Sequence, residues 1–408
     1  MTRRVPPQPW MREPAVAALL AALRQAGIAA RFVGGCVRDA LLGEPIADID
    51  LATPARPERV MAALAAAGIK AVPTGITHGT VTAVVITGGA PRHFEITTLR
   101  RDVETDGRHA RVAFGADWRE DAARRDFTIN AIYLDPDGTV HDPVGGLADL
   151  GAHRVRFVGD AATRIAEDVL RVLRYYRFAA RFGQGAGDPA ARAACRGAVP
   201  LLATLSAERV AGELQRLLAL PIPVRGLRMM EEDGVLAAVL PEATRIDRLE
   251  RLIAIERVPD ALRRLAALVD ADTHAMAAMA GRLRLSAAER DRLVGLAPPW
   301  PIDPTADGRG RRLTLYRLGA QRLVDLALLV LAEGGPAAAG AFLELAASWQ
   351  PPAFPLSGRD VTALGIAPGP RIGRLLAAVR QWWEEGDFVA DRTACLARLR
   401  EIARDAGQ

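Results

Sequence analysis

The sequence has little of what defines a disulfide-stabilised, metal-scaffold or membrane protein. It contains three cysteines, Cys36, Cys195 and Cys395, far apart and without metal-ligand spacing. Such cysteines are typical of reduced thiols in a cytoplasmic protein. No apolar run approaches the roughly 18 residues that a membrane-spanning helix needs. We therefore expect a cytoplasmic protein with no membrane association.

Lysine and aromatic residues are also scarce. Lys70 is the single lysine among 53 basic residues, and aromatic residues make up 5% of the chain. The net charge of +5 and the pI near 9.6 mildly favour an acidic partner such as nucleic acid. The apolar stretch "AVAALLAAL" follows Arg3 and Arg4, but Arg24 interrupts it, so an amphipathic helix beginning near Pro14 is favoured over a signal peptide.

The chain changes character near residue 155. Between residues 30 and 150, β-rich runs alternate with helical pieces, and "MAALAAAGI" is one of these helices. The later part repeats Ala, Leu and Arg at helical spacing, and "PPWPIDPTADGRG" (298–310) is its clearest linker. The fold class is therefore α+β, with an all-α remainder. The predicted strands are "ARFVGG", "DIDLAT", "GTVTAVVI", "HFEITTL" and "AIYLDPDGTVHD", the last a hairpin.

One short stretch, "GGCVRDALLGEPIADID", combines a glycine pair, a helix and two aspartates. Gly34 and Gly35 allow backbone N–H groups to approach a ligand, and the following helix points its positive end at the same place. Asp48 and Asp50 lie on one face of a strand, where they either repel each other or share a hard cation such as Mg²⁺. A tight turn followed by a solvated aspartate pair is the alternative for either feature alone, but their order favours a nucleotide site.

A third carboxylate, Glu95, lies mid-strand in "RHFEITTLR". A neighbouring strand could bring it beside the aspartates, where the cluster would hold a metal ion or a hydroxyl proton. A solvated strand position is the alternative.

The segment "RRDFTINAIYL" (124–134) combines charged and amide groups with apolar residues. Phe127 and Ile129 are predicted to be buried. Arg125 and Asn130 could grip phosphate and ribose hydroxyls, with Asp126 orienting the arginine. A capped helix start with surface charges is equally consistent with the residues alone.

A further constellation lies in "RIAEDVLRVLRYYRFAARF" (164–182), predicted to be one helix. Glu167, Asp168, Arg171 and Arg174 share one face of such a helix. A salt-bridged exposed stripe is the ordinary interpretation. An Asp acceptor beside an Arg donor also matches the amino group and unprotonated ring nitrogen of cytosine and adenine, and mismatches uracil and guanine.

Together these motifs resemble the class II tRNA nucleotidyltransferase and bacterial poly(A) polymerase family, within the polymerase-beta-type nucleotidyltransferases. The resemblance is close over residues 30–185 and looser afterwards, at 282–293 and 356–376. It rests on Gly34–Asp50, Arg124–Ala131, Asp142–Leu150 and Glu167–Phe178. It implies a mixed or antiparallel sheet with helices in a nucleotidyltransferase head (1–153), followed by a helical neck (154–220), body (221–300) and tail (301–408).

The resemblance also implies roles for individual residues. Asp48 and Asp50 would bind catalytic Mg²⁺, with Glu95 as the third catalytic carboxylate. The implied nucleotide-binding residues are Gly34, Gly35 and Arg38 at the triphosphate, Arg125, Asp126 and Asn130 at the ribose and phosphates, and Asp168 and Arg171 at the base, with Glu167 steadying the arginine and Arg174 on the same face.

The expected substrates are tRNA, CTP and ATP, and no obligate protein partner is inferred. "LRRDVETDGRHARVAF" (99–114) resembles the flexible loop of CCA-adding enzymes, which favours CCA addition over poly(A) synthesis or partial CC or A addition. The six histidines form no phosphohydrolase pattern. Arg371 and Arg374 are predicted to contact the tRNA backbone, with a solvated face as the alternative. An RNA-binding protein with an inactive head is the other class of function considered.

Overall fold

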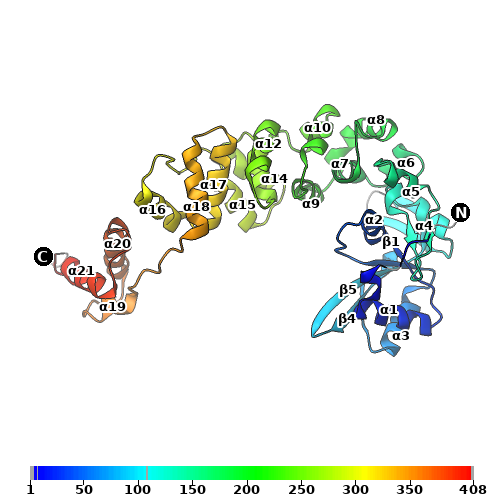
Figure 1. The fold of residues 1–408 in the computed structure, drawn as a ribbon, viewed down its shortest axis with the longest axis horizontal. Helices are drawn as coiled ribbons and strands as arrows, with labels where there is room; N and C mark the ends of the chain where they lie inside the picture. The colour runs from blue at the N-terminus through cyan, green and yellow to red at the C-terminus, as the bar shows by residue number, and fades with distance from the viewer. Residues whose placement is uncertain (1–3, 7, 107–108, 406–408) are drawn as a thin grey trace. The chain divides into compact units, whose positions relative to one another are not determined.

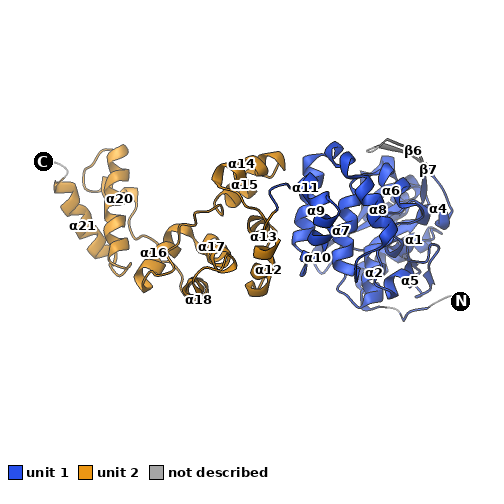
Figure 2. Cartoon of the chain, turned by 90° about the horizontal axis from the view of Figure 1, so that it is seen from above, with its two compact units in different colours: residues 1–243 blue, residues 244–408 orange. Residues whose placement is uncertain are grey.

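The computed structural model describes residues 4–6, 8–106 and 109–405 of the 408-residue chain (Figure 1). Contacts divide the chain into two compact units, residues 1–243 and 244–408 (Figure 2). The first unit combines a sheet with helices, and the regular structure described in the second unit is helical. The predicted α+β class with a helical remainder is therefore confirmed.

A mixed seven-stranded sheet forms the centre of the first unit, in the order β3-β4-β5-β2-β1-β8-β9. Strand β2 runs parallel to β5 and antiparallel to β1. This pairing sets Asp50 opposite Glu95 on one side and opposite Val33 on the other. The strands are β1 (Arg31–Val33), β2 (Asp50–Thr53), β3 (Lys70–Gly75), β4 (Thr80–Thr87), β5 (Ala90–Thr98), β8 (Tyr133–Leu134) and β9 (Val140–His141).

The five predicted strand regions are all present, with differences at the edges. Edge strand β3 was not predicted, because its residues, none of them buried, carry no apolar alternation. Strand β2 begins only at Asp50, so Asp48 lies in the preceding loop rather than in the strand. The 99–114 stretch contains a separate antiparallel ribbon of β6 (Arg100–Asp106) and β7 (His109–Phe114). Residues 107 and 108 of this predicted mobile loop lie outside the described residues.

Helices cover this sheet and continue beyond it. Helix α1 begins with Pro14 at its first position and buries Val16, Leu19 and Leu23, as an amphipathic helix should. The helices described in the first unit are η1 (Pro9–Arg12), α1 (Pro14–Gln25), α2 (Gly35–Leu42), α3 (Pro57–Ala66), η2 (Ile76–His78), α4 (Trp118–Ala123), η3 (Thr128–Asn130), α5 (Gly146–Gly151), α6 (Ala161–Glu167), α7 (Arg171–Phe182), α8 (Pro189–Gly197), η4 (Val199–Thr204), α9 (Ala207–Leu218), α10 (Val224–Glu232) and α11 (Val235–Val239).

The prediction of one helix over 164–182 is wrong. Helix α6 ends at Glu167, Asp168 has extended backbone angles (φ −154°, ψ 103°), and α7 begins at Arg171. The Asp168 carboxylate accepts the Leu170 N–H at 3.1 Å, an aspartate capping geometry that competes with helix continuation. The four charged residues therefore flank a helix break instead of lining one helix.

Among the described residues of the second unit, two apolar clusters can be named, and Trp349 packs against both. Leu315, Leu323 and Phe342 belong to one, while Trp383 and Leu399 belong to the other. No helix or strand is described between residues 294 and 308, so the predicted linker (298–310) is confirmed except for its last three residues, which begin α16. The helices are α12 (Ile246–Ile255), α13 (Ala261–Leu268), α14 (Thr273–Arg282), α15 (Ala287–Val294), α16 (Gly308–Leu318), α17 (Ala320–Ala332), α18 (Gly340–Ser348), α19 (Gly358–Thr362), α20 (Pro370–Glu385) and α21 (Arg392–Asp405).

Within the described part of the chain, none of the helices is long and apolar enough to cross a membrane. The four-part division at residues 153, 220 and 300 stays a prediction.

Candidate nucleotide site

The three predicted catalytic carboxylates gather at the start of β2. Asp50 is partly buried, Glu95 is its exposed neighbour on β5, and Asp48 is exposed just before the strand. Burial, followed by the charges of Glu95 and Asp48, raises the pKa of Asp50 from 3.8 to about 6, while Arg125 opposes the shift. Like charges disfavour each other's ionisation, so this is a place where a cation would be stabilised.

The donor set suits a metal ion that substrate oxygens help to hold. Among the described residues, no group of three or more His, Cys, Asp or Glu side chains is arranged as a complete metal site. Mg²⁺ is commonly held by one or two carboxylates together with substrate phosphates, rather than by an all-protein cage. The two aspartates supply hard carboxylate oxygens and therefore fit Mg²⁺ by donor chemistry.

A glycine turn places backbone next to these carboxylates. Gly34 has φ +77° at the N-terminal end of α2, a conformation that favours glycine. A Cβ at this position would lie 3.8 Å from Arg125 Nη1 and 3.9 Å from Asp50 Oδ2. The turn, a carboxylate and a guanidinium thus converge at the start of a helix, the arrangement expected for a triphosphate. Gly43, at φ +72°, ends the helix.

Arg125 is held by an aspartate that the sequence analysis did not identify. Asp121 on α4 is 1% exposed and accepts from Arg125 Nε at 3.2 Å and Nη2 at 3.1 Å. The same carboxylate accepts from the Tyr133 hydroxyl at 2.7 Å and also pairs with Arg124. The prediction that Asp126 orients Arg125 is therefore wrong. The spacing of Asp121 four residues before Arg125 is the one sequence signal that could have shown this pair.

Asp126 belongs instead to a polar chain that joins α2 to α7. Arg38 Nη1 donates to Asn130 Oδ1 at 2.6 Å, and Asn130 Nδ2 donates to Asp126 Oδ1 at 3.0 Å. Arg174 Nε completes the chain by donating to Asp126 Oδ2 at 2.9 Å. Burial by itself would raise the pKa of Asp126, but Arg174 and Asn130 hold it below its ordinary value. The guanidinium of Arg38 also lies 4.1 Å from the ring centroid of Phe182.

The predicted base-reading residues lie on either side of the helix break. Arg171 donates to Glu167 Oε2 at 2.6 Å, to the Arg164 carbonyl at 2.8 Å and to the Arg124 carbonyl at 3.2 Å. Glu167 therefore steadies Arg171, as predicted. Asp168 pairs with Arg209 of α9, a residue that the sequence analysis missed because no local spacing connects the two.

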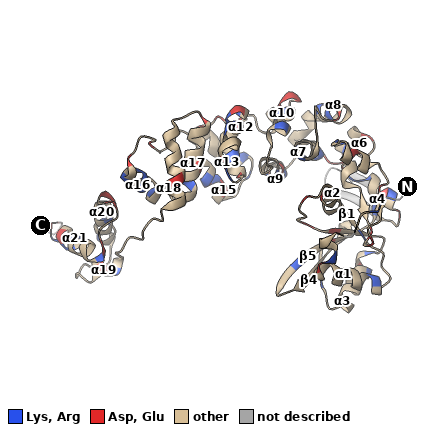
Figure 3. Cartoon of the chain, in the orientation of Figure 1, with Lys and Arg blue, Asp and Glu red and all other residues tan. Residues whose placement is uncertain are grey.

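The second unit carries the basic residues that are predicted to contact the tRNA backbone. Arg371 and Arg374 both lie exposed on α20. Helix α16 is dense in basic residues, with four arginines and no acidic residue in its sequence (Figure 3). Whether these arginines contact RNA stays a prediction.

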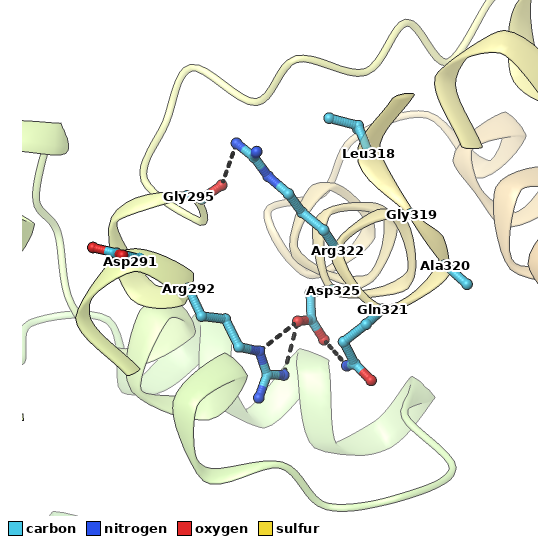
Figure 4. Close-up of a pocket in the computed structure, with 9 residues that line it drawn as sticks. All are labelled: Asp291, Arg292, Gly295, Leu318, Gly319, Ala320, Gln321, Arg322 and Asp325. Atoms are coloured by element: carbon cyan, nitrogen blue, oxygen red, sulfur yellow. Dashed lines mark hydrogen bonds and ion pairs between the residues drawn. The ribbon is translucent and has the colours of Figure 1, made fainter. Parts of the chain in front are cut away.

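A pocket of about 370 Å³ lies between α15 and α17 in this unit (Figure 4). Its two arginines already have protein partners. Arg292 Nη2 donates to the buried Asp325 at 2.8 Å, and Arg322 Nη2 donates to the Gly295 carbonyl at 3.2 Å. Gln321 donates to the other Asp325 oxygen at 3.1 Å. The polar groups of this pocket therefore connect α15 with α17, which is a structural role.

Comparison with known proteins gives two family-model matches within residues 30–246 and relatives that cover most of the chain. Residues 30–156 match the family model "Poly A polymerase head domain", and residues 188–246 match "Probable RNA and SrmB- binding site of polymerase A". The chain is 34% identical over 381 residues to the mitochondrial CCA tRNA nucleotidyltransferase 1 of Danio rerio, which covers 90% of this chain and 86% of that protein.

Two bacterial proteins match over nearly the full length. The CCA-adding enzyme of Limosilactobacillus fermentum is 31% identical, with 95% of this chain and 96% of that protein covered. The crystal structure of the Bacillus stearothermophilus CCA-adding enzyme in complex with CTP superposes with a TM-score of 0.77 at 31% identity, covering 98% of this chain and 99% of that chain.

Proposed function

Because this chain belongs to the family of CCA tRNA nucleotidyltransferases, we propose specific roles for its residues in the family's reaction. The protein adds or restores the 3′-terminal CCA of tRNA, using CTP and ATP and releasing pyrophosphate. The observation that carries the assignment to a site is the convergence of Asp50 and Arg125 on the Gly34 turn, within 4 Å of a Cβ at that position.

The triphosphate is assigned to the turn and the helix behind it. The N–H groups at Gly34 and Gly35 and the positive end of α2 suit phosphate oxygens, and Arg125 adds a guanidinium held in place by Asp121. Arg38 links α2 to Asn130 through their hydrogen bond. These groups would hold the nucleotide with its α-phosphate beside the carboxylates.

The carboxylates are assigned to the reacting end. Asp48 and Asp50 would hold the divalent cation of this metal-dependent reaction, and we propose Mg²⁺ on the basis of their hard oxygen donors. In the two-metal mechanism that we propose, one such ion would lower the pKa of the attacking hydroxyl and a second would stabilise charge on the leaving pyrophosphate.

The tRNA 3′-oxygen then forms a bond to the α-phosphorus, while the bond from that phosphorus to the bridging oxygen of pyrophosphate breaks. We propose that Glu95 accepts the hydroxyl proton, because it is exposed and lies opposite Asp50 in the β2–β5 register.

The choice of base is assigned to the helix break. Asp168 can accept from the exocyclic amino group of cytosine or adenine, and Arg171 can donate to the ring nitrogen beside it. Uracil and guanine present a carbonyl and an N–H at the same positions, so both contacts would be lost. A bidentate contact of this kind discriminates by about 1–3 kcal/mol.

A primer-extension experiment tests this function. tRNA ending before CCA, after C and after CC would each be offered labelled CTP or ATP, alone and together, and product length scored. We expect C to be added to the first two substrates and one A to the third. Long A tails on unrelated RNA would instead identify a poly(A) polymerase, and failure of either C or A addition would identify a partial enzyme.

The remaining assignments concern the whole chain. We propose that residues 1–153, 154–220, 221–300 and 301–408 serve as head, neck, body and tail, and that Arg371 and Arg374 contact the tRNA backbone. The three cysteines are unpaired and buried, which suits a reducing cytoplasm.

A further inference from the structure

Asp168 and Arg171 are opposite charges three residues apart, yet each is paired elsewhere. Among the ion pairs of the described residues, none joins these two side chains to each other. Arg171 donates to Glu167 Oε2 at 2.6 Å, and Asp168 accepts from Arg209 Nη2. An ion pair between Asp168 and Arg171 would occupy the acceptor and the donor that a base needs. Their contacts with Arg209 and Glu167 therefore keep the two side chains apart.

The contacts of the Asp168 carboxylate can be counted. Oδ1 accepts the Leu170 N–H at 3.1 Å and Arg209 Nη2 at 2.9 Å, and Oδ2 accepts the same Nη2 at 2.8 Å. A carboxylate offers about four lone-pair sites. Counting the contacts given above for the described residues, one site remains, and it is on Oδ2. An amino group of cytosine or adenine can donate to that site, whereas the carbonyl of uracil or guanine cannot.

Arg209 is itself fixed relative to α7. It lies in the first turn of α9, which buries Val210 and Leu214. One turn further along, Glu213 accepts from Arg177 Nε of α7 at 2.7 Å. The guanidinium is thus anchored by a packed helix rather than by a loop.

We propose that Arg209 is a specificity-determining positioning residue, which holds the Asp168 carboxylate so that a single Oδ2 acceptor faces the incoming base. Arg209 acts through Asp168 and need not touch the nucleotide. The inference rests on the proposed role of Asp168 and Arg171 in reading the base. Without Arg209, the carboxylate is free to rotate and to pair with Arg171, which would remove both base contacts at once.

The test measures kcat/KM for CTP against UTP on tRNA ending before CCA, and for ATP against GTP on tRNA ending after CC. Arg209→Ala should lower both ratios by roughly tenfold or more, because both contacts of the bidentate pair would be weakened. Arg209→Lys should restore most of the selectivity, because one nitrogen makes both present contacts. Arg216→Ala is the matched control, since Arg216 is an exposed arginine on α9 that pairs with Glu213; its ratios should equal those of the wild type.

The outcomes separate the inference from the function on which it rests. If Arg209→Ala lowers kcat/KM equally for all four nucleotides, Arg209 is only a structural contact and the inference is wrong. If Asp168→Ala itself leaves the ratios unchanged, the base-reading role fails, and the inference with it. If Asp168→Ala abolishes selectivity while Arg209→Ala preserves it, only the inference fails. If the Arg209→Ala variant does not fold, Arg209→Gln takes its place in the test. Its selectivity should lie between that of Arg209→Lys and that of Asp168→Ala.

Discussion

The carboxylate at the centre of the site should reduce the stability of the metal-free protein. Burial and the neighbouring charges of Glu95 and Asp48 raise the pKa of Asp50 from 3.8 to about 6. Each unit of pKa difference between the folded and unfolded states corresponds to about 1.4 kcal/mol, so ionised Asp50 costs about 3 kcal/mol above pH 6. Because the folded state holds its proton more tightly, this cost grows as pH rises from 3.8 to 6 and is absent below 3.8.

Asp50→Asn removes the charge and should therefore stabilise the free protein while it abolishes nucleotide addition. Hydrogen exchange of peptides that cover β2 and β5, without divalent cations, measures the effect in this unit alone. At pH 8 the asparagine variant should exchange roughly 100-fold more slowly in the most protected amides, and the ratio should shrink as pH falls below 6. Added Mg²⁺ should slow exchange in the wild type and not in the variant.

Glu44→Gln is the control for this experiment, since Glu44 is an exposed carboxylate in the loop after α2. Its exchange should match the wild type at every pH. Equal protection of wild type and Asp50→Asn at pH 8, or a difference that does not depend on pH, would refute the reasoning that ionised Asp50 destabilises the folded protein.

Two further substitutions test the supports of the site. Gly34→Ala forces a side chain into φ +77°, ψ −131°, a conformation that costs about 1–3 kcal/mol outside glycine, and should raise KM for both nucleotides; an unchanged KM would remove the turn from the triphosphate site. Asp121→Asn leaves Arg125 without its buried charge partner and should destabilise the first unit by about 3 kcal/mol. The variant should also raise KM for the nucleotide, and this rise should exceed any change in the unfolding rate of peptides far from the site. Normal affinity for CTP in that variant would show that Arg125 needs no anchor.

Much of the site could be predicted from the sequence because its parts are local. The glycine turn, the helix after it and the first strand residue Asp50 follow one another within 17 residues, and each has its own conformational signal. The contact between Glu167 and Arg171 is likewise a spacing of four. Glu95 lies beside Asp50 because β2 and β5 pair in parallel, a placement that the strand pattern allowed but could not decide.

The partners that hold the site in place could not be predicted. Arg209 reaches Asp168 across 41 residues, and Arg174 reaches Asp126 across 48. Such pairs depend on how helices pack, and sequence periodicity carries no information about that. The break at Asp168 was also missed, because the apolar pattern continues through it and only the capping contact of its own side chain ends α6.

The scarcity of lysine has a consequence for experiments on the edge of the sheet. Lys70, the single lysine of the chain, is exposed at the first position of β3, the strand at one end of the sheet. A protease that cuts only after lysine therefore has one target bond in all 408 residues. Cleavage there requires β3 to separate from β4, so the rate at which two fragments appear measures the fraying of this one edge strand.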